Sequence, residues 1–137
     1  MTEPEIAITN ANIIVGYFGY WPSFHDAEVI SIKLDRHQVM LEAVLHVIAL
    51  SNEVTESGHL KAAKSCIVTM RFYSIRDMIL QGFNSQNALL RINFDLVHTG
   101  EIRVDLVPAY GLDGKFICRN AEVVSLDRTE DTQERTP

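Results

Sequence analysis

The segment Trp21-Pro22-Ser23-Phe24-His25-Asp26-Ala27-Glu28 separates two sequence patterns and thereby decides the fold. Before it, apolar residues recur at helical spacing between Asn10, which with Thr9 can cap a helix, and Gly19, which can end it. After it, the apolar period is two, as in β-strands. Pro22 prevents the helix from continuing, because proline has no backbone N–H group. The segment therefore predicts a junction between a short helix and a sheet.

Alternating apolar residues predict the first two strands after this segment. We expect Ile30, Ile32 and Leu34 on one face of the first strand, and the polar turn at 35–38 leads into a second strand over 39–50. The second strand is apolar on both faces. This pattern predicts either a central position in the sheet or a second face that a helix or a partner chain covers.

The rest of the chain continues in strands, with no helix between them. The same alternation occurs at 66–72, 90–96, 102–106 and 116–126. Pro108 is expected to stop one ladder, and a change of apolar parity predicts a bulge near Asn120. The predicted class is α+β, with a mostly antiparallel sheet of about six to seven strands and a short N-terminal helix packed on it. We expect one domain over 1–126 and a flexible C-terminal tail over 127–137, which lacks apolar residues.

Composition and charge narrow the classes of partner. The 137 residues are 47% hydrophobic and 22% charged, as in an ordinary globular domain, and the net charge is −6. The basic residues are scattered, so we expect no nucleic-acid partner. An acidic surface steers basic proteins toward it, although it also simply favours solubility. The acidic N-terminus and the lack of a long apolar run predict a cytoplasmic protein that does not contact the membrane.

The chain shows no spacing typical of a metal or cofactor site. Cys66 and Cys118 both fall on the apolar face of a predicted strand, which favours two reduced core thiols over a disulfide or a metal pair. The five histidines lack the short spacings that place two nitrogens on one ion. We therefore expect no metal and no cofactor.

His25 and Asp26 are the first candidates for chemistry, and three interpretations of them compete. They could serve a small hydrolase or isomerase, but a nucleophilic site would need Ser23 to converge with them, and adjacent side chains of an extended chain point apart. They could instead be structural, with Asp26 accepting backbone N–H bonds that set the turn and His25 bonding a neighbouring carbonyl. The third interpretation is contact with a partner.

Aromatic residues are concentrated beside these candidates. Tyr17, Phe18, Tyr20, Trp21 and Phe24 are five of the chain's eleven aromatics and lie within eight residues. Such a cluster is typical either of a core that clamps the helix onto the sheet or of an exposed recognition patch. We expect the core.

The run from Phe18 to Val29, FGYWPSFHDAEV, resembles the signature of the immunity protein 50 family, which occurs beside toxin genes in bacterial polymorphic toxin systems. A looser resemblance covers nearly the whole chain. It includes Asn10, Arg71-Phe72, the turn at 82–87 and the strand at 121–126. The resemblance implies a non-enzymatic protein that binds a cognate toxin domain and blocks it. It transfers no catalytic residue, and Trp21 to Asp26 with Glu28 serve as a structural signature.

The polar stretch at 51–65 is where we look for toxin contacts, because long polar loops are often functional. It can equally be a solvated connection between strands. The candidate contact residues are Glu53, Glu56 and His59, together with Tyr20. The acidic charge favours a basic toxin as partner, and a homodimer or a structural assembly subunit with an apolar strand at its interface stays open as an alternative.

Overall fold

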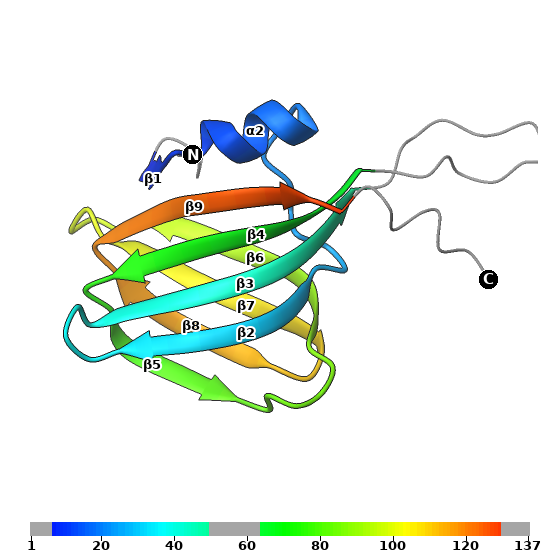
Figure 1. The fold of residues 1–137 in the computed structure, drawn as a ribbon. Helices are drawn as coiled ribbons and strands as arrows, with labels where there is room; N and C mark the ends of the chain where they lie inside the picture. The colour runs from blue at the N-terminus through cyan, green and yellow to red at the C-terminus, as the bar shows by residue number, and fades with distance from the viewer. Residues whose placement is uncertain (1–6, 50–63, 130–137) are drawn as a thin grey trace, which may run out of the picture.

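The computed structural model describes residues 7–49 and 64–129, which form nine strands and one short helix (Figure 1). The elements are β1 (Ile8–Thr9), α2 (Asn12–Phe18), β2 (Glu28–Asp35), β3 (Met40–Ala49), β4 (Lys64–Tyr73), β5 (Arg76–Gln81), β6 (Ala88–Leu96), β7 (Ile102–Tyr110), β8 (Asp113–Cys118) and β9 (Asn120–Arg128). All nine strands belong to one sheet, and β1 pairs with β9 in parallel, so the sheet is mixed. A mostly β fold with one short helix is confirmed, but the expected six to seven strands are too few, and the expected mostly antiparallel sheet is a mixed one because of the parallel pair β1–β9.

The sheet folds back on itself and encloses the core between two layers. Its strand order is β1-β9-β4-β3-β2-β6-β7-β8-β5, and the register of β2 with β6 contains the single pair Glu28 and Ala88. The chain folds over at this point, so that β9, β4, β3 and β2 lie in front of β6, β7 and β8 in Figure 1, with β5 below β2. Phe72 of β4 and Phe116 of β8 contact across the core, with ring centroids 5.0 Å apart.

The helix lies beside β9 and covers one side of the two layers (Figure 1). Its Ile14 and Phe18 are buried, and Gly19 ends it in a left-handed conformation, donating its N–H to the carbonyl of Val15. Capping by the Asn10 side chain was wrong, because the cap position is Ala11 and carries no side-chain bond. Within the described ranges, no helix is both long and apolar enough to cross a membrane.

Register shifts move two apolar residues away from the faces that alternation predicts. In β2 the shift lies between Val29 and Ser31, so that Val29 is buried while Ile30 is 49% exposed. In β6 the shift between Leu89 and Arg91 exposes Leu90 in the same way. The expected apolar faces of these strands were therefore only partly right, since each bulge inserts one residue and reverses the parity.

The predicted strand over 116–126 is in fact two strands in different layers. β8 pairs with β7 and β5, whereas β9 pairs with β4 and β1. At the crossing, the N–H of Arg119 donates to the carbonyl of Tyr73. The change of parity near Asn120 thus marks a change of layer and not a bulge. β9 continues through Asp127 and Arg128, into the stretch expected to be a tail.

Two further details of the sequence prediction are settled by the strands. Pro108 lies within β7, opposite Leu89 at a register shift, so it does not stop the ladder. Cys66 and Cys118 are buried and free, as predicted, and burial raises the pKa of their thiols to about 11 and about 12. At neutral pH both are therefore protonated and packed as core residues.

Asn87 ties two turns to the start of β2. Its side-chain Oδ1 accepts the N–H groups of Asn84 and Leu112 at 2.9 and 3.0 Å, and its Nδ2 donates to the carbonyl of Asn84 at 2.7 Å. Its backbone N–H donates to Glu28 Oε2 at 2.6 Å. Asn87 is only 2% exposed, so these bonds satisfy polar groups that would otherwise be buried without partners.

Gly111 packs so closely against Asn87 that a larger residue cannot fit. A Cβ at this position would lie 2.3 Å from the carbonyl oxygen of Gln86, and φ is +88°. Gly100 has a similar φ of +90° but open space around it. We predict that Gly111→Ala lowers the free energy of unfolding by about 2–5 kcal/mol, because alanine there suffers both the steric clash and the left-handed backbone conformation. Gly100→Ala should lower it by only about 1–2 kcal/mol, the cost of the left-handed conformation alone. Chemical denaturation measures the free energy of unfolding of both variants. An equal decrease in the two variants would contradict the close contact at Gly111.

Glu101 holds the turn before β7 to the start of β5. Its carboxylate accepts bonds from Arg76 at 2.8 and 3.1 Å and from the hydroxyl of Thr99 at 2.9 Å. These bonds, first of all those from Arg76, lower the pKa of Glu101 to about 2. The carboxylate therefore stabilises the fold only when it is ionised.

Because the pKa of Glu101 is lower in the folded state, its contribution is complete above pH 4.5 and is lost as the pH falls through about 2. We predict that Glu101→Gln destabilises the protein at neutral pH. The difference in free energy of unfolding between the variant and the unmodified protein should shrink as the pH falls from 4.5 to 2. Denaturant unfolding over this range is the measurement. A difference that does not change with pH would show that the loss has another cause.

Candidate functional site

The segment from Ser23 to Val29 joins the two layers by running beside β6. Backbone bonds link them at both ends: Ile92 donates to Ser23 at 3.0 Å, Asp26 to Leu89 at 2.8 Å, Leu89 to Ala27 at 2.9 Å and Val29 to Asn87 at 2.9 Å. The motif thus extends the short pairing of β2 with β6 as an irregular strand. It is a junction between layers as well as between helix and sheet.

Two residues in left-handed conformations shape this irregular strand. Phe24 and Asp26 both have φ of +67°, which is uncommon for residues other than glycine and is an outlier for a bulky side chain. Phe24 is 1% exposed, with its ring 5.6 Å from that of Trp21 and 6.2 Å from that of Phe94. The unusual backbone turns Phe24 into the core and leaves His25 and Asp26 outside.

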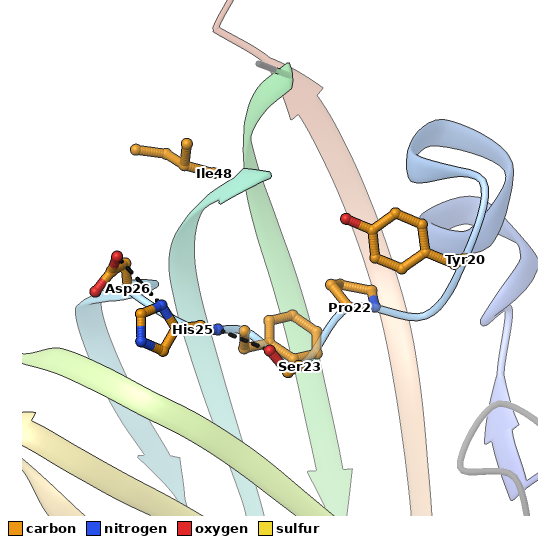
Figure 2. Close-up of a pocket in the computed structure, with 7 residues that line it drawn as sticks. Tyr20, Pro22, Ser23, His25, Asp26 and Ile48 are labelled. Atoms are coloured by element: carbon orange, nitrogen blue, oxygen red, sulfur yellow. Dashed lines mark hydrogen bonds and ion pairs between the residues drawn. The ribbon is translucent and has the colours of Figure 1, made fainter. Parts of the chain in front are cut away.

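An open hollow of about 360 Å³ lies over the outer side of this segment (Figure 2). It is lined by Tyr20, Pro22, Ser23, Phe24, His25, Asp26 and Ile48. The imidazole Nδ1 of His25 is 3.2 Å from Asp26 Oδ2, and both side chains are about two-thirds exposed. Asp26 therefore contacts its neighbour His25, whereas we had expected its carboxylate to accept backbone N–H bonds.

The polar groups of the hollow do not form a catalytic relay. The hydroxyl of Ser23 accepts a long bond, 3.4 Å, from the backbone N–H of His25 and not from the imidazole. No nucleophile is thus placed against a base with an orienting acid behind it. Over residues 7–49 and 64–129, no group of three or more His, Cys, Asp or Glu side chains could hold a metal ion.

The aromatic cluster divides between the core and the surface. Phe18 and Phe24 are buried, while Tyr17 and Trp21 pack against the core and are partly buried. Tyr20 is 52% exposed at one end of the hollow (Figure 2). The cluster therefore mainly clamps the helix onto the sheet, and Tyr20 is its one member with a largely exposed side chain.

A second polar cluster fastens the end of the helix to the strands. The carbonyl of Ser65 accepts a bond from the Tyr17 hydroxyl at 3.1 Å, and its hydroxyl bonds Thr129 and, at 3.0 Å, His46 Nε2. Lys64 Nζ donates to the Tyr17 carbonyl at 2.6 Å. His46 is thus bound within the framework and does not need a ligand to satisfy it.

The other predicted site residues fall in different places. Glu28 bonds Asn87 in the framework, and Glu53, Glu56 and His59 lie outside the described residues. Sequence reasoning missed Ile48, which is 38% exposed and lines the hollow. Its place at the end of the strand that is apolar on both faces was the signal that could have identified it.

These observations define a small β-rich domain in which a conspicuous motif belongs mainly to the framework. The chain belongs to the immunity protein 50 family, because the family model described as Immunity protein 50 matches residues 10–128 and hence most of the chain. The resemblance noted from the motif is confirmed. The comparison with curated proteins and the comparison with solved structures gave no significant match.

The framework role of the motif predicts a sharp contrast between neighbouring residues. Phe24→Ala removes a buried ring and should lower the free energy of unfolding by about 3–5 kcal/mol. His25→Ala removes one partner of an exposed polar contact and should change the free energy of unfolding by less than about 0.5 kcal/mol. Thermal and denaturant unfolding of both variants tests this. A larger loss for His25→Ala than for Phe24→Ala would contradict the account.

Proposed function

We propose that this chain is a non-enzymatic immunity protein that binds and neutralises a cognate toxin domain of a bacterial polymorphic toxin system. The observation that carries the proposal is the family match over residues 10–128. An immunity protein acts by binding, so it needs a stable framework and an accessible surface. We expect it to act in the cytoplasm, where a toxin would meet it.

The charge of the chain favours a basic toxin as partner. There are 18 acidic and 12 basic residues. A net charge of −6 raises the rate at which a cationic protein associates with this one, and salt screens that effect. Binding should therefore become slower as ionic strength rises.

The exposed part of the hollow supplies contact chemistry of the kind that interfaces use. Tyr20 and Ile48 offer apolar area, and the His25 and Asp26 pair beside them is polar and accessible. Tyrosine is enriched at binding hot spots. The alternative of a small hydrolase or isomerase would need His25 and Asp26 to act on a substrate, and no serine or cysteine is aligned with them in the described residues.

The proposal predicts protection of cells from the toxin domain encoded next to this chain's gene. Co-expression should restore growth of cells that produce that domain, and the two proteins should purify together. Matched cultures with an empty vector give the control. If growth is not restored and the proteins do not purify together, the proposed function is wrong.

A further inference from the structure

The two layers are covered differently on their two opposite sides. Helix α2 lies along the side near β9, whereas β2 and β5 lie on the other side in Figure 1. Beyond Glu28, β2 pairs only with β3, and β5 pairs only with β8, among the described residues. Both strands therefore have one edge whose backbone N–H and C=O groups have no partner strand.

An apolar hollow of about 330 Å³ lies between these two edges. We call it the β2–β5 groove, and it is lined by Ile32, Leu80, Gln81, Gly82, Phe83 and Leu112. Leu112 is buried at 1% exposure, while Phe83 is 54% exposed. The groove thus has a floor that belongs to the core and a rim of accessible apolar area.

Leu34 shows that this side of the core is open. It lies directly opposite Leu41, which is fully buried, so both side chains are on the core-facing side of the layer. Leu34 is nevertheless 51% exposed. It lies two residues beyond Ile32 on the same face of β2, next to the residues that line the groove.

The two edges differ in their ability to accept another strand. The register of β5 shifts between Arg76 and Ile79, and Asp77 has a φ of +54°, so this edge is irregular. β2 pairs in regular register with β3 from Ser31 to Asp35. A regular edge beside exposed apolar side chains is the arrangement that strand addition uses.

We propose that the β2–β5 groove binds one extended segment of the cognate toxin, which pairs with the free edge of β2 over residues 31–35. Alternate side chains of that segment would pack on Leu34 and Phe83, while its backbone satisfies the edge of β2. This inference rests on the proposed function and adds the binding mode to it.

The net charge of the chain favours a toxin segment over a second copy of this chain as the occupant of the groove. Two copies would each carry a net charge of −6 and repel one another, whereas a basic partner is attracted. In every copy β5 lies on the same side as the free edge of β2 (Figure 1), so pairing two β2 edges would also bring the two β5 strands together, whereas a single extended segment would not.

The test compares two leucines of similar exposure in complexes with the toxin domain encoded next to this chain's gene. Leu34 is 51% exposed beside the groove, and Leu96 is 47% exposed at the end of β6, where the chain turns toward β7. We expect Leu34→Asp to weaken binding at least about tenfold, equivalent to about 1.4 kcal/mol, and Leu96→Asp to leave it within about twofold.

Hydrogen exchange of the unmodified protein gives an independent readout that does not depend on the folding of a variant. Adding the toxin domain should slow exchange of amides within residues 31–35. If the unmodified protein does not bind the toxin domain at all, the proposed function itself has failed. If it binds, but those amides stay unprotected and Leu34→Asp binds as well as Leu96→Asp, the groove proposal is overturned.

Light scattering tests whether a second copy of this chain, and not a toxin segment, occupies the groove. We expect the free protein not to self-associate through β2. A dimer that Leu34→Asp converts to a monomer would show that a second copy occupies the groove, and it would overturn the proposal.

Discussion

The fold depends on the backbone bonds between the Ser23–Val29 segment and β6. Regular pairing between β2 and β6 is limited to Glu28 and Ala88, which is too little to hold two layers together. The irregular strand adds bonds on either side of that pair, and Phe24 fills the space beneath it. Left-handed backbone conformations cost energy, so they persist here because the aromatic packing and the bonds to β6 require them.

This constraint explains how the motif contributes to the framework. His25 and Asp26 lie outside because the residues around them turn inward. The same fold-over leaves one side of the core under helix α2 (Figure 1). The other side is open at the β2–β5 groove. A family defined by immunity to toxins needs such accessible surface on a rigid framework.

Regular strands could be predicted from the sequence, and irregular ones could not. The alternation of β3, β4 and β7, the helix end at Gly19 and the burial of the two cysteines all follow from the pattern of neighbouring residues. Ile30 and Leu90 escaped prediction because a register shift depends on the partner strand. The separation of β8 from β9 also escaped, since a change of layer and a bulge give the same change of parity.

The site was less predictable than the fold because its parts meet only in three dimensions. The motif could be recognised from a contiguous run of residues, but its bonding to β6 could not. Asn87 belonged to the loosely similar pattern, and its role depends on Glu28 and Leu112, which are distant in sequence. The β2–β5 groove likewise joins strands separated by β3 and β4.

The most direct test of the central claim, that the motif joins the two layers, is residue-resolved amide exchange of the free protein. The account predicts that Asp26, Val29, Leu89 and Ile92 exchange about as slowly as amides in the middle of the β3–β4 ladder, within about tenfold, because all four are bonded across the junction. Exchange as fast as in the exposed turn at 98–100 would contradict it. The motif would then be a surface loop.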